Sequence, residues 1–155
     1  MPFTLRIIEF ISLALLLLVT GVFWGTWFSL SRSIEKFTAD NFLAIGKVII
    51  RNLAVPMRIL MPLTILFMAA GLWLYPEKVN AGFYLEIISF ALIVITLHIT
   101  VLIEVPIDNR IKRWTTTTLP VDWKSLRSKW EFFHTIRTFT SIGSFLLLLL
   151  AVLFY

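Results

Sequence analysis

The chain has 155 residues, of which 59% are hydrophobic and only 15% are charged, and its mean hydropathy is +0.90. Soluble domains carry about 25% charged residues, so this composition excludes an ordinary soluble domain and indicates one integral membrane domain over residues 1–155. The absence of cysteine excludes disulfide bonds, CxxC redox pairs and thiolate metal sites. The net charge of +5 is interpreted as a topology signal and not as a nucleic-acid surface, because no soluble basic module is left to bind one.

Four apolar runs are long enough to cross a bilayer, since a spanning helix needs roughly 20 apolar residues. The first run, residues 5–30, is too long for a signal peptide and lacks a small-residue cleavage site, so we expect it to stay in the protein as a helix. The other spans are predicted over residues 57–75, 83–105 and 129–155, and the fourth helix is predicted to begin with an amphipathic part near Asp122. The predicted fold class is therefore all-α, a transmembrane four-helix bundle.

The segment 31–55, between the first two spans, has apolar residues at helical intervals with charged residues between them. This pattern predicts an amphipathic interfacial helix, at the membrane surface or packed under the bundle. After the third span, Pro106 is expected to end the helix, so that residues 106–129 form a polar loop.

Lysine and arginine are distributed unevenly over the predicted loops. Eleven of them fall in or beside the loops 31–56 and 106–129, whereas only Arg6 and Lys78 fall on the other side. By the positive-inside rule, the two basic loops face the cytoplasm and both termini are non-cytoplasmic. The compact loops and the lack of a targeting extension favour a bacterial inner membrane.

The start of the fourth span carries a polar and aromatic stripe. Its members are spaced by three or four residues, which places them on one face of a helix with 3.6 residues per turn. Glu131 lies on the flank of this face. Ionisable groups inside a membrane are costly and usually functional. The stripe consists of Trp123, Arg127, Trp130, His134, Arg137 and Ser141.

The third span carries its own polar residues, among them His98 and Glu104. At 1.5 Å rise per residue, His98 and His134 are predicted at similar depths, where they could face each other. At the opposite end, Glu9 and Glu86 are expected to reach the interface beside Arg6. An interfacial aromatic belt at the tryptophans, and a packing role for His98, are the simpler alternatives.

A metal site is not predicted, because no inward-facing Glu-x-x-His pair is repeated across helices. The two histidines could instead be axial haem ligands. No phosphate-binding loop, dinucleotide fingerprint or nucleophile elbow is present.

The run from Pro106 to Thr138 resembles the anthrone oxygenase-like family of small four-helix membrane proteins. The resemblance implies a four-helix membrane fold over the whole chain. It also implies a role like that of some fungal members, which oxidise anthrones to anthraquinones without an obvious cofactor motif. The matching positions are Pro106, Asn109, Trp123, Arg127, Trp130, His134, Arg137 and Thr138.

The first functional hypothesis is a cofactor-independent oxygenase or oxidase for an apolar phenol- or quinol-like substrate. His134 would be the general base, tuned by Glu131 or Asn109, and Arg137 and Arg127 would stabilise the resulting anion. Tryptophan side chains would stack on the ring. The candidate catalytic residues are His134, Arg137 and Asn109, and the candidate substrate-binding residues are Trp114, Trp123, Arg127, Trp130, Glu131, His98 and Glu104.

The second hypothesis is a non-enzymatic membrane module that binds quinone, lipid or haem, or a structural subunit whose polar groups lock the bundle. No cofactor is predicted, and haem or quinone stays open. The expected partners are membrane lipids, an apolar small molecule and a second copy in a homo-oligomer. A transporter ranks last, because no span shows the paired broken-helix pattern.

Overall fold

The computed structural model describes residues 3–155, and all regular elements in this range are helices. The all-α fold class is confirmed, and four helical segments are long and apolar enough to cross a membrane. The elements are α1 (Phe3–Ser29), the 3-10 helix η1 (Ser31–Lys36), α2 (Ala39–Leu74), α3 (Ala81–Ile99), the π-helix η2 (Thr100–Glu104), α4 (Val105–Arg113) and α5 (Trp123–Phe154).

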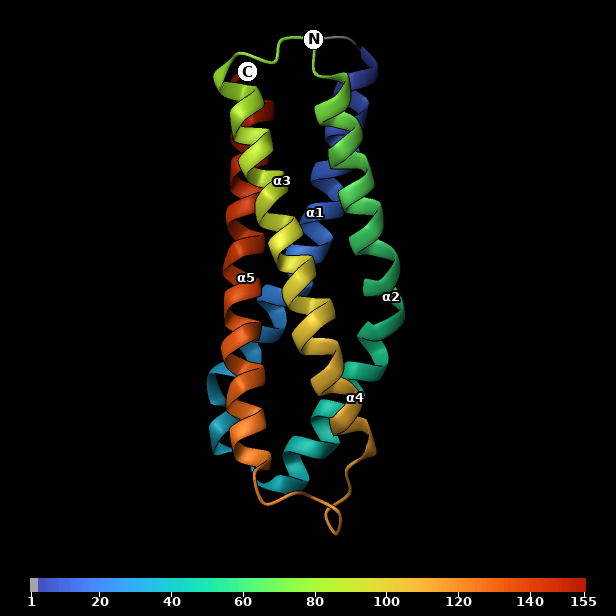
Figure 1. Ribbon diagram of the computed structural model, residues 1–155, viewed down its shortest axis with the longest axis vertical. Coiled ribbons are helices and arrows are strands. Elements are labelled where there is room, and N and C mark those ends of the chain that lie inside the picture. The colour runs from blue at the N-terminus through green and yellow to red at the C-terminus, as the bar shows by residue number, and fades with distance from the viewer. Residues whose placement is uncertain (1–2) are drawn as a thin grey trace.

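The four long helices run up and down the molecule (Figure 1). α3 packs along α5, and α1 packs against both α2 and α5. α1 begins and α5 ends at the same end of the bundle as the α2–α3 turn, whereas η1, α4 and the start of α2 lie at the other end. Large apolar side chains such as Leu66, Leu102 and Phe132 are exposed on the outside, as expected of helices that face lipid.

The amphipathic segment is helical, but it is the first half of α2 and not a separate element. The second helix therefore begins at Ala39 instead of residue 57. Thr38 caps its start by accepting a hydrogen bond from the backbone N–H of Asn41 at 3.3 Å. Pro56 and Pro62 lie inside α2, and the first part of the helix crosses beneath the bundle before the rest rises beside it (Figure 1).

The prediction that Pro106 ends the third helix is wrong. The chain continues from α3 through η2 into α4 and stays helical to Arg113. In η2 the hydrogen bonds widen, and the N–H of Val105 bonds to the carbonyl of Thr100, five residues back. Pro106 is the second residue of α4 and directly follows this π turn. The polar loop therefore covers only residues 114–122, because α4 continues to Arg113 and α5 begins at Trp123, next to the predicted helix start near Asp122.

Hydroxyl groups join α3 to α5. Ser89 and Ser144 each donate to the other's backbone carbonyl, at 2.7 and 2.8 Å. One level further along, the hydroxyls of Thr96 and Thr140 lie 2.8 Å apart. Small residues of this kind let helix backbones approach closely where burial from water cannot drive packing.

Two acidic side chains at the end near the termini do not reach the surface as expected. Glu9 of α1 and Glu86 of α3 are only 2% and 3% exposed. Gly71 of α2 leaves room for them, since a Cβ atom there would lie 3.8 Å from Oε2 of Glu86. Burial between helices therefore replaces the predicted extension to the interface.

Two apolar clusters form the core. The first fills the middle of the bundle, and the second fills the end where α2 crosses beneath α4 and α5. The first comprises Leu16, Val19, Phe23, Met61, Met68, Ile93 and Leu148, and the second comprises Ile34, Phe42, Leu43, Ile50, Ile107, Ile111 and Trp130.

Candidate functional site

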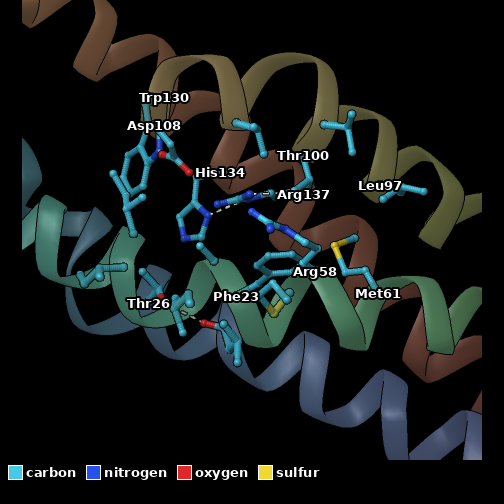
Figure 2. Close-up of a pocket in the computed structure, with 18 of the residues that line it drawn as sticks. Phe23, Thr26, Arg58, Met61, Leu97, Thr100, Asp108, Trp130, His134 and Arg137 are labelled. Atoms are coloured by element: carbon cyan, nitrogen blue, oxygen red, sulfur yellow. Dashed lines mark hydrogen bonds between the residues drawn. The ribbon is translucent and has the colours of Figure 1, made fainter. Parts of the chain in front are cut away.

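A cavity of about 380 Å³ lies between the two apolar clusters, among α1, α2, α5 and the chain from the end of α3 to α4 (Figure 2). Members of both clusters contribute to its walls, including Phe23 and Met61 from the first and Ile50 and Trp130 from the second. The polar groups that line it are Thr26, Arg58, Thr100, Asp108, Asn109, Lys112, His134 and Arg137.

Arg137 is the centre of a buried polar network. Its Nε donates to Nδ1 of His134 at 3.0 Å, and its Nη2 lies 3.0 Å from Oε2 of Glu104. Its Nη1 reaches Oγ1 of Thr100 at 3.5 Å. Glu104 is fully buried and Arg137 is 9% exposed, so each charge depends on the other to offset the loss of water.

The geometry of His134 determines which of its nitrogens carries the proton. A guanidinium group can only donate, so Nδ1 of His134 must accept the hydrogen bond from Arg137. A neutral imidazole then has its proton on Nε2. Nε2 is buried and has no hydrogen-bonding partner within residues 3–155. His134 therefore has an unused N–H donor at the cavity.

Aromatic rings surround His134. The Trp130 ring stacks on the imidazole, with centroids 5.2 Å apart and an interplanar angle of 19°. Phe23 meets the imidazole edge to face at 6.3 Å, and the guanidinium carbon of Arg137 lies 4.7 Å above the Phe23 ring. The Trp130 Nε1 donates to Oδ1 of Asp108 at 3.1 Å, which fixes the orientation of the indole ring (Figure 2).

The local helix geometry explains why these groups meet. Trp130, His134 and Arg137 are spaced by four and three residues, so they share the inward face of α5. Thr100 and Glu104 are the first and last residues of η2. π-helical turns are frequent at functional sites, and this one carries both groups that contact the Arg137 guanidinium from α3's side of the cavity.

The structure brings part of the predicted site together. His134, Arg137, Trp130 and Asn109 line the cavity, and Glu104 lies behind Arg137 as its ion-pair partner. Asn109 is exposed at the edge of the cavity, where its Oδ1 accepts from Lys112 at 3.4 Å. It does not contact His134, so it cannot tune the imidazole as the sequence suggested.

Four other predicted residues lie outside the cavity, at the end of the bundle beyond it. Trp123 packs against Phe42 at 5.7 Å, and the Arg127 guanidinium lies 5.2 Å over the Trp123 ring. Arg127 also donates to the carbonyl of Glu35 at 3.4 Å, not to Glu131. Glu131 is partly exposed, and Trp114 packs at the edge of the second apolar cluster.

His98 does not face His134. Its side chain is exposed, and its Nδ1 bonds to the carbonyl of Val94 at 2.8 Å on its own helix. The two-histidine arrangement considered for haem is therefore not formed. Within residues 3–155, no group of three or more His, Asp or Glu side chains is placed to hold a metal ion.

Most lining residues were not predicted as site residues, among them Phe23, Arg58, Thr100, Asp108 and Lys112. The sequence could have indicated Arg58, because it is a charged residue in an apolar run between Pro56 and Pro62. It could also have indicated Asp108, because this residue lies inside the Pro106–Thr138 run that carries the resemblance. Phe23 and Thr100 had no signal that separates them from ordinary helix-packing residues.

The chain matches a known protein family. The family model described as anthrone oxygenase matches residues 52–147, which are 96 of the 155 residues. The matched stretch runs from within α2 to within α5 and includes every polar residue of the cavity except Thr26. No curated protein and no solved structure matches the chain. Because the match covers more than half of its length, the chain belongs to the anthrone oxygenase family.

Proposed function

We propose that this chain is a small membrane oxygenase that oxidises a flat, weakly acidic aromatic substrate of the anthrone type with molecular oxygen. The observation that carries the proposal is the cavity in which the free N–H of His134 lies among aromatic rings and beside Arg137. Family membership supports the same chemistry.

The reaction balances without a further oxidant. A CH₂ carbon activated by the neighbouring rings loses one hydrogen as a proton, which leaves an anion delocalised onto the ring oxygen. Oxygen adds to this carbon, and the proton returns to the outer oxygen to give a hydroperoxide. Loss of water from the hydroperoxide breaks the O–O bond and leaves a C=O group. One oxygen atom thus enters the substrate, and the other leaves as water with the two hydrogens.

His134 has a different role here from the general base expected from the sequence. With Nδ1 occupied by Arg137, the imidazole presents an N–H and not a lone pair. We assign it the role of donor to the oxygen on which negative charge develops. Donors prearranged in this way stabilise an anionic transition state.

Asp108 is the base in this proposal. Oδ1 accepts from Trp130, and the carboxylate lines the cavity next to the ring that stacks on His134. A carboxylate can accept further hydrogen bonds through its remaining lone pairs. Asp108 can therefore take the proton while a flat ring lies against the apolar walls of the cavity, which include Ile50 and Met61.

We also propose that the cavity lies towards the cytoplasmic side. η1, α4 and the basic loops are at this end of the bundle, whereas Arg6 and Lys78 are at the other end. Both termini would then be non-cytoplasmic, in the inner membrane of a bacterium.

A second candidate function is binding without turnover. It is favoured by Arg137, because each of its three nitrogens already contacts a protein partner: Thr100 and Glu104 of η2, and His134 of α5. On this reading the network is structural, and the cavity holds a quinone or lipid.

Oxygen uptake by purified protein in mild detergent, with anthrone as the probe, tests the proposal. We expect Asp108→Asn to lower kcat/KM by about 10²–10⁴, as loss of a general base does. We expect His134→Gln to lower it by about 10²–10³, as loss of an oxyanion donor does. The matched controls Asp40→Asn and His98→Gln change exposed side chains and should keep full activity.

Two results would count against the oxygenase. Folded Asp108→Asn and His134→Gln proteins that oxidise anthrone at the unaltered rate would remove both assigned roles. An unaltered protein that binds anthraquinone but does not accelerate oxygen uptake above the spontaneous rate would favour binding without turnover.

A further inference from the structure

The cavity holds more positive charge than its own acidic groups offset. Arg137 is paired with Glu104 at 3.0 Å. Two further cations, Arg58 from α2 and Lys112 from α4, also line the cavity, whereas Asp108 is the one carboxylate in its wall. Among residues 3–155 no carboxylate lies within 4.0 Å of either one, because the Arg137–Glu104 contact is the only ion pair there.

Arg58 points into the cavity and not away from it. In Figure 2 its side chain extends from the α2 side towards Arg137, above Phe23 and beside Met61. Two guanidinium groups on the same side of a cavity repel each other unless an anion lies between or beside them. Arg58 is exposed, and no carboxylate of residues 3–155 lies within 4.0 Å of its guanidinium, so this group is available to an anion that enters the cavity.

Polar groups also lie on the α4 side of the cavity. Lys112 and Asn109 are one turn apart on α4, and the Lys112 Nζ contacts Oδ1 of Asn109 at 3.4 Å. The lysine thus has donors left over. Arg58 on α2 and Lys112 on α4 line the same cavity, and these two helices contact each other. Both cations can therefore act on one end of a ligand while its rings contact Trp130 and Phe23.

We propose that the ligand of this cavity carries a carboxylate on its ring system, bound by Arg58 and assisted by Lys112. The inference rests on the proposed function, since it concerns the substrate of the same site. A planar guanidinium matches a carboxylate through two parallel hydrogen bonds. A cavity of about 380 Å³ is within the range of small-molecule sites, about 300–1,000 Å³, and accommodates a fused ring system.

Binding of two probes with the same rings tests the inference. Anthraquinone-2-carboxylate and neutral anthraquinone are titrated into protein in a nonionic detergent, and binding is followed by quenching of tryptophan fluorescence, to which Trp130 in the cavity contributes. The unaltered protein should bind the carboxylate at least about tenfold more tightly than the neutral probe, as one charge-assisted interaction gives.

Arg58→Gln should remove this preference and leave the Kd of the neutral probe unchanged. Lys112→Gln should reduce the preference by a smaller factor. Arg51→Gln is the matched control, because Arg51 is exposed on the same helix and outside the cavity. If Arg58→Gln does not fold, Arg58→Lys keeps the charge without the planar fork and should show a weakened preference.

Each other outcome has a defined meaning. A preference that persists in Arg58→Gln, or equal Kd values in the unaltered protein, overturns the carboxylate inference but leaves the oxygenase proposal intact. Failure of both probes to bind counts against the oxygenase proposal itself. Displacement of the carboxylate probe by added phosphatidylglycerol, dependent on Arg58, would identify a lipid phosphate as the partner and overturn the inference.

Discussion

Arg137 is a buried cation whose donors contact three different partners on two helical segments. It holds His134 in one tautomer, pairs with Glu104 and reaches Thr100. The stacked ring of Trp130 fixes the imidazole from the other side. At the scale of single residues, the site is therefore an oriented N–H donor held by an ion pair, and the free proton position of His134 is a consequence of Arg137.

Replacing Glu104 by glutamine should destabilise the protein more than replacing both members of the pair. Glu104→Gln leaves the Arg137 charge buried without a counter-charge, which costs about 3–5 kcal/mol. The double variant Glu104→Gln/Arg137→Gln removes that charge and should recover part of the loss. Thermal unfolding in detergent measures this, with exposed Glu35→Gln as the control. Additive losses would mean that the two groups do not interact.

The helices position the site through local departures from regular geometry. η2 widens one turn at the end of α3, and Pro106 then begins α4. Between α3 and α5, small hydroxyl residues allow close approach. At the opposite end the same principle applies to Gly82 of α3, where a Cβ atom would meet Tyr75 and would lie 2.6 Å from Cβ of Tyr155.

Gly82→Ala should therefore lower the unfolding temperature, because overpacking against two tyrosines costs about 1–3 kcal/mol. Gly21→Ala is the matched change, since a Cβ atom there meets nothing within 4 Å. It should be neutral or stabilising by up to about 1 kcal/mol from helix propensity. The measurement is the unfolding temperature of each variant in the same detergent. An unfolding temperature for Gly82→Ala equal to that of Gly21→Ala would contradict the packing.

At the scale of the whole molecule, the bundle separates two ends of different character. The cavity, η1, α4 and most basic residues lie towards one end, and the chain ends and the α2–α3 turn lie at the other (Figure 1). A ligand that enters near Lys112 would therefore approach from the basic side. The orientation in the membrane decides which compartment or leaflet supplies it.

Single cysteines test this orientation cleanly, because the chain has none of its own. Thr116→Cys in the 114–122 loop and Val79→Cys in the α2–α3 turn both place the thiol at an exposed position. A membrane-impermeant maleimide added to spheroplasts should label Val79→Cys at once and Thr116→Cys only after lysis. The reverse pattern would place the cavity towards the non-cytoplasmic side.

Composition and local spacing determined the helical architecture. Apolar runs of about 20 residues favour spanning helices whatever packs beside them, so the four-helix class could be read from the sequence. The polar stripe on α5 could also be predicted from the sequence, because Trp130, His134 and Arg137 recur at helical spacing. The structure buries all three side chains. Pro106 shows the limit of local rules, since the chain continued the helix through a π turn.

Tertiary structure alone decided which groups meet. α3 carries polar residues both inside the bundle, such as Ser89 and Thr96, and outside it, such as His98. Only the packing of α3 against α5 decided that His98 turned outward while Glu104 of η2 turned towards Arg137. The proton on Nε2 of His134 likewise depends on a tertiary contact, the hydrogen bond from Arg137 to Nδ1. Arg58 reaches the same cavity only because α2 packs beside α1. The spacing of hydrophobic residues indicates which side chains lie inside a helix bundle. The partners of a polar side chain are determined by the rotation and register of the neighbouring helices.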